Sequence, residues 1–234
     1  MYLKDFLTIV IPCKNENKTI DKTLSLLNQQ KNIQGTKVIV SDISDDGTTY
    51  ELESRQNDLF ELHITQGGLP SVARNNGAKL VRTPYILFID SDIFITDELL
   101  LTKMVHIIME KNMDLLTTRF RTTTGEYNYV FKTFDIIQRL IKPITPFSLG
   151  GFMLVKTNVF NYYGGFNEEA KVAEDYLFSK QIKPNKFYIS KSVVYTPPRR
   201  FENKGVLYMM RLMIKSFLNR NNKQFFNDDN TYWK

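Results

Sequence analysis

The stretch Tyr85-Ile-Leu-Phe-Ile-Asp-Ser-Asp92 decides the fold prediction. Its first five residues are β-branched, aromatic or leucine, which is typical of a short buried strand, and two carboxylates follow at once. Similar runs at residues 6–11 and 37–40 also end in polar residues, Pro12 to Glu16 and Ser41-Asp42. Helical patterns separate the three runs. We therefore expect βαβ units, a mostly parallel α/β sheet, and ligands at the carboxyl ends of its strands.

The composition is that of an ordinary folded protein. Of 234 residues, 42% are hydrophobic and 24% are charged, which excludes a disordered chain, a collagen-like repeat and a coiled coil. The single cysteine, Cys13, excludes a disulfide framework and fits a reducing compartment. The apolar run 6–11 is too short for a signal peptide, and no window has the apolar length of a membrane-spanning helix. A cytoplasmic location is expected.

The net charge of +6 predicts an anionic partner, which can be a nucleotide, a nucleic acid or a membrane surface. Most of the excess lies in residues 199–234, where eight Lys or Arg face three acids. Residues 205–218 have the pattern of a basic amphipathic helix, with Arg211 and Lys215 one turn apart. Peripheral contact of residues 205–223 with an anionic membrane, and packing against the catalytic domain or a second subunit, both stay open. No base-stacking or groove-reading element is recognisable, so no nucleic-acid partner is expected.

Acidic residues follow each of the three strand-like runs. Asp90 and Asp92 can both reach a cation beyond the sheet edge, and Mg²⁺ or Mn²⁺ bound by such oxygens often completes its shell with phosphate. Taken alone, an Asp-x-Asp pair is more often explained by turn or cap chemistry. Asp42 can hydrogen-bond a ribose or a base edge, or open a turn, and Glu16 can stabilise a helix start.

Eight short motifs follow one another along the chain. The first four are Ile9-Val-Ile-Pro-Cys-Lys-Asn-Glu16, Val38-Ile-Val-Ser-Asp42, Gly67-Gly-Leu-Pro-Ser-Val-Ala-Arg-Asn-Asn-Gly77 and Ile86-Leu-Phe-Ile-Asp-Ser-Asp92. The others are Gly150-Gly-Phe-Met-Leu-Val-Lys-Thr-Asn-Val-Phe160, Gly164-Gly-Phe-Asn-Glu168, Glu174-Asp175 and Pro198-Arg-Arg-Phe-Glu202. Their order and spacing resemble glycosyltransferase family 2. The resemblance runs from residue 6 to about residue 206.

This resemblance implies the GT-A fold, a mostly parallel Rossmann-like sheet flanked by helices that binds a nucleotide. It implies a single domain at residues 1–204, with a donor-binding half at about 1–117 and an acceptor-binding half at about 118–204. A basic amphipathic helix and tail at 205–234 would follow.

The same resemblance implies roles for matching residues. The donor would contact Pro12, Glu16, Asp42, Arg74, Asp90, Ser91, Arg199 and Arg200, and the acceptor would contact Gly150, Gly151, Phe152 and Glu174. Asp92, together with Asp90, would hold Mn²⁺ or Mg²⁺ on the diphosphate. Asp175 would be the catalytic base.

Parts of this assignment have a plainer alternative. The pair Glu174-Asp175 also fits an acidic helix start stabilised by the helix dipole, and the pair Arg199-Arg200 also fits two solvated charges. The segment Asp42-Ile-Ser-Asp-Asp-Gly-Thr48 is shorter than the corresponding loop of the family, which leaves its contacts with a nucleotide base open.

The reaction implied is the transfer of a sugar from a UDP- or GDP-sugar to a hydroxyl of a glycan or lipid-linked acceptor, in cell-surface polysaccharide or glycoconjugate synthesis. The metal would neutralise the leaving diphosphate while a base takes the acceptor proton, and a single displacement inverts the anomeric centre. A polyprenyl-phosphate sugar synthase and a non-catalytic nucleotide-binding module are the alternatives. The location expected is cytoplasmic, with peripheral attachment to the cytoplasmic face of the membrane left open.

Overall fold

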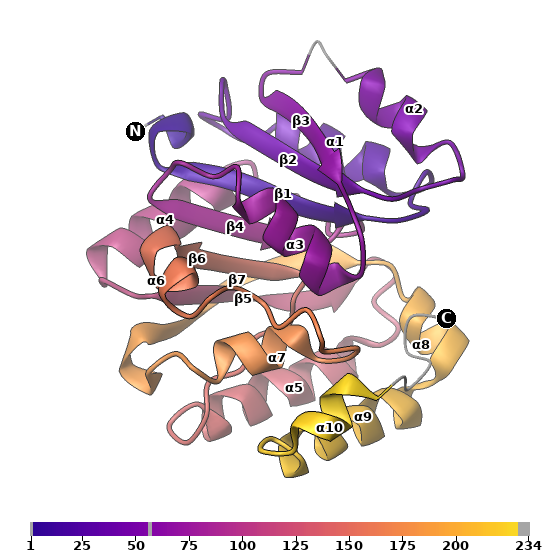
Figure 1. Ribbon diagram of the computed structural model, residues 1–234, viewed down its shortest axis with the longest axis vertical. Coiled ribbons are helices and arrows are strands. Elements are labelled where there is room, and N and C mark those ends of the chain that lie inside the picture. Colours follow the sequence, from indigo (N-terminus) through magenta and orange to yellow (C-terminus); the bar gives the residue numbers. More distant parts are fainter. Residues whose placement is uncertain (1, 56–57, 229–234) are drawn as a thin grey trace.

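A seven-stranded sheet forms the centre of the protein. The computed structural model describes residues 2–55 and 58–228, and within them the strand order is β3-β2-β1-β4-β6-β5-β7 (Figure 1). The strands are β1 (Leu7–Cys13), β2 (Lys37–Asp42), β3 (Glu61–Gln66), β4 (Tyr85–Ile89), β5 (Leu115–Thr122), β6 (Phe152–Lys156) and β7 (Phe187–Thr196). The predicted mixed α/β class with a mostly parallel sheet is confirmed.

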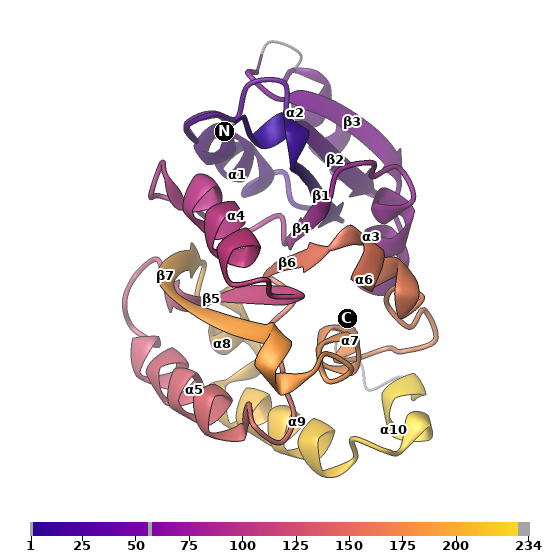
Figure 2. The same cartoon turned by 90° about the vertical axis from the view of Figure 1, so that its left-hand side faces the viewer.

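Helices cover both faces of this sheet, α1 and α4 on one face and α3, α6 and α7 on the other (Figure 2). The first five are α1 (Ile20–Asn28), α2 (Thr48–Glu53), α3 (Pro70–Ala78), α4 (Leu100–Glu110) and α5 (Asn128–Ile141). They are followed by α6 (Thr157–Tyr162), α7 (Glu174–Ser179), α8 (Arg199–Lys204), α9 (Val206–Leu218) and α10 (Lys223–Asn227). Short 3-10 turns lie at η1 (Leu3–Asp5) and η2 (Pro184–Lys186).

Strand direction brings distant segments to one edge of the sheet. β1 pairs in parallel with β2 and β4, β2 with β3, and β5 with β7, whereas β6 is antiparallel to both β4 and β5. The amino end of β6 therefore lies at the edge where the other strands have their carboxyl ends. In register, Cys13 pairs with Asp42, and Ile89 pairs with Phe152. The residues after β1, β4 and β7 thus meet those before β6.

Strand β4 is buried on both faces, which holds its carboxyl end rigidly. Leu87 and Ile89 belong to the core under α1 and α4, and Ile86 and Phe88 belong to the core under α3, α6 and α7. The ring of Phe88 packs against that of Phe160 with centroids 5.0 Å apart. Full burial of one such side chain stabilises the fold by roughly 1.5–3 kcal/mol. The two aspartates after β4 are therefore attached to one of the best packed strands.

The basic segment near the C-terminus contains helices α8 and α9, separated by Gly205. Within the thirteen residues of α9, Ser216 alone is buried. Across the described part of the chain, no helix combines the length and apolar character needed to cross a membrane.

Candidate active site

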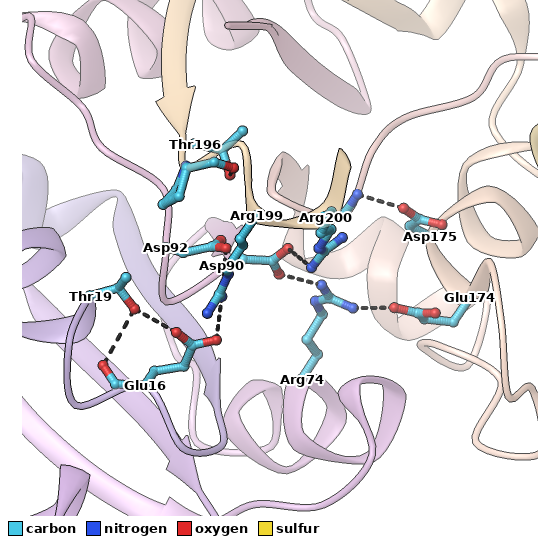
Figure 3. Close-up of polar contacts among 12 residues, drawn as sticks. Glu16, Thr19, Arg74, Asp90, Asp92, Glu174, Asp175, Thr196, Arg199 and Arg200 are labelled. Atoms are coloured by element: carbon cyan, nitrogen blue, oxygen red, sulfur yellow. Dashed lines mark hydrogen bonds and ion pairs between the residues drawn. The ribbon is translucent and has the colours of Figure 1, made fainter. Parts of the chain in front are cut away.

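Charged side chains from five segments meet at the shared edge of the sheet (Figure 3). They form two groups. The inner cluster consists of Arg74, Asp90, Glu174 and Asp175, and the outer cluster consists of Glu16, Asp92 and Arg199. Asp90 connects the inner cluster to Arg200, whose guanidinium lies 3.7 Å from the Asp90 carboxylate.

Arg74 is the centre of the inner cluster. Helix α3 begins with Pro70 at its first turn and positions Arg74 on its buried face. One guanidinium nitrogen donates to Glu174 at 2.5 Å and the other donates to Asp90 at 2.6 Å. Burial by itself would lower the pKa of Arg74, but the two carboxylates raise it above its ordinary value, so the side chain stays charged. Arg74 thus joins the segment after β4 to the start of α7.

The ring of Phe166 lies beside this guanidinium, with the Arg74 Cζ atom 5.5 Å from the ring centroid. The Nε atom of Arg74 is buried and has no hydrogen-bond partner among the described residues. The guanidinium is consequently held by its two terminal nitrogens and by an aromatic face.

Asp175 is held by backbone N–H groups. Its two carboxylate oxygens accept from the amides of Gly150 at 2.6 Å and of Tyr176 at 2.7 Å. Burial, and then the charge of Glu174, raise the pKa of Asp175 to about 7, against the opposing effects of Arg74 and the two amides. A carboxyl with that pKa can accept a proton near neutral pH, as general-base catalysis requires.

The backbone around Asp175 is constrained on both sides. Ala173, directly before α7, has a φ of 53°, a left-handed conformation that is uncommon for a residue with a side chain. A Cβ at Gly150 would lie 2.7 Å from the Arg74 guanidinium and 3.3 Å from the Asp175 carboxylate. This close approach explains the Gly-Gly motif, since a Cβ at Gly151 would likewise lie 2.9 Å from the Phe120 ring. Glycine is required here for space.

Arg199 binds both carboxylates of the outer cluster. Its Nη2 atom donates to Glu16 at 2.5 Å and to Asp92 at 2.7 Å. The Asp92 side chain is almost fully buried, and burial raises its pKa, with Arg200 and Arg199 acting in the opposite direction. By contrast, the Arg199 side chain is 38% exposed. A half-exposed cation therefore lies over the buried carboxylate that the sequence assigned to a metal.

The donor set at Asp90 and Asp92 fits a hard divalent cation. Within residues 2–55 and 58–228, no group of three or more His, Cys, Asp or Glu side chains could hold a metal ion. Two carboxylates supply part of an oxygen shell, and Mg²⁺ or Mn²⁺ usually completes it with water and phosphate oxygens. A metal here would depend on a phosphate-bearing ligand.

Other predicted donor residues lie apart from the two clusters. Asp42 accepts hydrogen bonds from Ser44 at 2.5 Å and from Thr49 at 2.8 Å, which closes the short loop between β2 and α2. Pro12 lies beside Ser41 in the β1–β2 register.

Two further residues are positioned mainly through their backbone. Ser91 is buried, and its carbonyl accepts from the hydroxyl of Thr23 in α1. Phe152 is fully buried in the core, and its carbonyl accepts from Thr117. A ligand would meet Phe152 through the main chain at the start of β6, because its ring faces away into the core.

Aromatic contacts that sequence patterns did not indicate hold α8 in place. The ring of Phe201 stacks on that of Tyr127 at 5.0 Å and meets the edge of Phe131 at 5.4 Å. Thr19, also missed, donates its hydroxyl to Glu16 at 2.5 Å. Phe201 directly follows the Arg-Arg pair, and its place in that motif was the sequence feature that could have indicated its role. These contacts of Phe201 fix α8 so that Arg199 reaches Glu16 and Asp92.

The family assignment follows from comparison with known proteins. The family model described as "Glycosyl transferase family 2" matches residues 8–164, which contain the segments that carry Glu16, Arg74, Asp90 and Asp92. This chain belongs to glycosyltransferase family 2. The matched residues run from β1 through α6.

Curated relatives include two bacterial transferases. The chain is 28% identical over 237 residues to the poly(ribitol-phosphate) beta-N-acetylglucosaminyltransferase TarS of Staphylococcus aureus, covering 91% of this chain and 40% of that protein. It is also 28% identical over 222 residues to a poly(ribitol-phosphate) beta-glucosyltransferase of Bacillus spizizenii, covering 83% of this chain and 35% of that protein. The chain thus spans about two fifths or less of the length of these relatives.

Solved structures share the fold. TarS of S. aureus in complex with UDP-GlcNAc matches with a TM-score of 0.65 and 24% identity, over 82% of this chain and 58% of that one. The mannosyltransferase PcManGT of Pyrobaculum calidifontis, in complex with GDP-Man and Mn²⁺, matches with a TM-score of 0.68 and 18% identity, over 81% and 56% of the two chains. The predicted GT-A fold is therefore confirmed.

Proposed function

We propose that this chain transfers a sugar from a nucleoside-diphosphate sugar to a hydroxyl of a glycan or lipid-linked acceptor, with inversion, in cell-surface polysaccharide synthesis. The observation that carries the proposal is the inner cluster. Arg74 joins Asp90, at the expected donor side, to Glu174, and the neighbouring Asp175 is hydrogen-bonded to Gly150. A proton acceptor next to a nucleotide-type sheet edge fits transfer better than nucleotide binding alone.

Donor binding is proposed at the outer cluster and the loops beside it. Asp92 and Asp90 would hold Mn²⁺ or Mg²⁺, which supplies charge neutralisation for the diphosphate. The Mn²⁺ in the P. calidifontis complex supports a divalent metal. The nucleoside would contact Pro12, Glu16, Asp42 and the backbone of Ser91. Arg74 would also contact the donor, and Arg199 and Arg200 would bind the diphosphate.

Arg199 and Arg200 suit the phosphates because a guanidinium can donate two parallel hydrogen bonds to phosphate oxygens. Arg199 now pairs with Glu16 and Asp92, and a bound diphosphate would offer it a second set of oxygens. The UDP-GlcNAc in the TarS complex and the GDP-Man in the PcManGT complex support a UDP- or GDP-sugar donor.

Asp175 is proposed as the base that takes the acceptor proton. Its raised pKa and its fixed position between two amides leave the carboxylate ready to accept a proton at neutral pH. Gly150, Gly151, the backbone of Phe152 and Glu174 would line the acceptor side. Both curated relatives are named as poly(ribitol-phosphate) transferases, which supports a polymeric, polyol-phosphate-containing acceptor.

A polyprenyl-phosphate sugar synthase stays the alternative, because a phosphate acceptor needs little help from a base. A nucleotide-binding module without catalysis is the other, although it has no use for Asp175. We also propose the division into a domain at 1–204 and a basic helix and tail at 205–234. Peripheral contact of residues 205–223 with an anionic membrane on the cytoplasmic side completes the proposal and would bring a lipid-linked acceptor close.

A donor and acceptor screen tests the proposal. The protein is incubated with UDP-GlcNAc, UDP-Glc and GDP-Man, with Mn²⁺, Mg²⁺ or EDTA, and with either poly(ribitol phosphate) or polyprenyl phosphate. We expect nucleotide release that requires one donor, a divalent metal and the polymer. Product formation with polyprenyl phosphate alone would select the alternative, and donor binding without turnover on any acceptor would select the binding module.

A further inference from the structure

Helix α9 exposes an apolar stripe on its outer side. Leu207, Ile214 and Leu218 follow at i, i+7 and i+11, which places them on one side of a helix, and they are 70%, 56% and 68% exposed. Arg211 and Lys215, both exposed, lie along one edge of the stripe at the same helical spacing. Apolar side chains of this size are normally buried when they recur on one side of a helix.

Helix α5 repeats the arrangement. Ile136 and Leu140 lie one turn apart and are 60% and 72% exposed, and Ile144, just beyond the helix, is 76% exposed. Lys132 and Arg139 are exposed along one edge of this second stripe. Two helices that are far apart in the sequence thus have the same surface pattern, an exposed apolar stripe with basic residues along one edge.

The two helices lie at the same end of the molecule. Figures 1 and 2 both place α5 and α9 at the end opposite α2 and β3. Gly205 is the single residue between α9 and α8, the helix that carries Arg199 and Arg200. The exposed stripes therefore adjoin the segment that supplies cations to the candidate active site.

The exposed charge on α5 and α9 themselves is of one sign. Residues Asn128–Ile141 contain one acid, Asp135, which is buried and paired with Arg121, and Val206–Leu218 contain none. None of the four basic residues along the stripes, Lys132, Arg139, Arg211 and Lys215, forms an ion pair with any carboxylate in the described part of the chain. Apolar side chains flanked by cations match a bilayer surface that carries anionic headgroups.

We propose that α5 and α9 together form a membrane-docking face that binds the surface of an anionic lipid bilayer. The inference rests on the membrane contact proposed for residues 205–223 and extends it to a second helix that the basic tail does not contain. The apolar stripes enter the headgroup region, and the cations along their edges meet lipid phosphates. A second copy of the chain is a poorer occupant, since a symmetric pairing would bring two basic faces together without acids to neutralise them.

Vesicle sedimentation with the full chain tests this face. Vesicles of phosphatidylcholine alone are compared with vesicles containing half phosphatidylglycerol, at two salt concentrations. We expect binding to the anionic vesicles that weakens with salt. The double variants Ile136→Gln/Leu140→Gln and Leu207→Gln/Ile214→Gln should each weaken binding about tenfold, because each removes two apolar groups from the bilayer contact.

Removing two cations at a time tests the electrostatic part. Lys132→Gln/Arg139→Gln and Arg211→Gln/Lys215→Gln should each weaken binding to anionic vesicles at least about tenfold, since each basic residue near such a surface contributes roughly a factor of five. The matched control is Tyr50→Gln/Leu59→Gln, which changes two exposed apolar residues at the opposite end and should leave binding unchanged.

The possible outcomes of these vesicle experiments distinguish the two-helix face from its alternatives. If the α9 variants lose binding and the α5 variants retain it, the two-helix face is wrong and the contact of 205–223 alone stands. Equal binding to both vesicle types, or none, overturns the proposal. A concentration-dependent dimer that the apolar variants dissociate, seen by light scattering, would reassign the face to contact between copies. Unchanged transfer to a water-soluble acceptor in all variants separates a failure here from a failure of the proposed function.

Discussion

The two charge clusters of the candidate site use arginine in opposite ways. In the inner cluster, Arg74 is almost fully buried and bridges two carboxylates at 2.5 and 2.6 Å. In the outer cluster, Arg199 has similar distances but is 38% exposed and comes from a short helix after the last strand. Buried ion pairs are costly to break on one side, whereas exposed ones contribute little to stability. The inner cluster therefore stabilises the structure of the site, whereas Arg199 of the outer cluster can exchange its carboxylate partners for a ligand.

Loss of the inner arginine should have the largest effect. Arg74→Met leaves Asp90 and Glu174 without their shared cation, and we expect the free energy of unfolding to fall by about 3–5 kcal/mol and transfer to be lost. Arg74→Lys should recover part of the stability, because one ammonium cannot bridge both carboxylates in the same way. The measurement is urea unfolding followed by circular dichroism.

The control for this comparison is Arg82→Met. Arg82 is exposed and donates only to nearby backbone carbonyls, so its loss should change stability by less than about 0.5 kcal/mol. Equal stability losses in Arg74→Met and Arg82→Met would remove the distinction between a structural inner cluster and the surface.

The second prediction concerns the proposed base. Asp175→Asn should lower kcat by about 10²–10⁴ while the donor Kd changes less than about threefold, since the carboxylate acts on the acceptor proton. Turnover under saturating donor and donor binding by calorimetry give the two numbers. Asp5→Asn, at an exposed position in η1 before β1, is the control. A variant with wild-type kcat would exclude Asp175 as the base.

The third prediction is a pH dependence of turnover caused by Asp175 in the inner cluster. With a pKa of about 7, Asp175 is deprotonated and active above that pH, so kcat should fall about sevenfold from pH 7 to pH 5.9 and approach a plateau above pH 8. Because its folded pKa is raised, its contribution to folding stability is full below about pH 4 and is lost as the pH rises through about 7. A flat kcat profile between pH 6 and 8 would contradict the assignment.

The smallest effect belongs to the outer cluster. Arg199→Ala should weaken donor binding by about five- to tenfold through loss of a phosphate contact, while stability changes by less than about 1 kcal/mol. Calorimetry with the donor and Mn²⁺, and a thermal scan without ligand, separate the two quantities. Arg139→Ala on α5 serves as the matched control for removing one exposed arginine. A large stability loss with unchanged donor affinity would make Arg199 structural.

Sequence patterns are most informative where the signal is local. Strand β4 is recognisable from five apolar residues and two acids, because a buried central strand must be apolar on both faces. Strand β6 was not predicted, since its four apolar residues follow a glycine motif that resembles an acceptor-side pattern. Helix α2, which is only six residues long, was not predicted either. Short elements carry too few periods to be recognised.

The same distinction between local and long-range signals applies to the residues of the candidate site. The carboxylates at strand ends were found because an acid after an apolar run is visible in one window of sequence. That Arg74 pairs with Glu174, one hundred residues away, was not visible, because it depends on how α3 and α7 pack on the same face of the sheet. The sequence placed these two residues in different halves of the site, and their direct contact is a property of the fold.

By itself, then, the sequence determined the α/β class, the family and the set of polar residues, since apolar patterning and motif order are encoded residue by residue. The tertiary structure alone decided that β6 runs antiparallel, which brings Gly150 to Asp175. It also decided that Asp175 is buried next to a like charge and has a pKa of about 7. Strand direction and burial are long-range outcomes of packing, so neither can be read from a local stretch of residues.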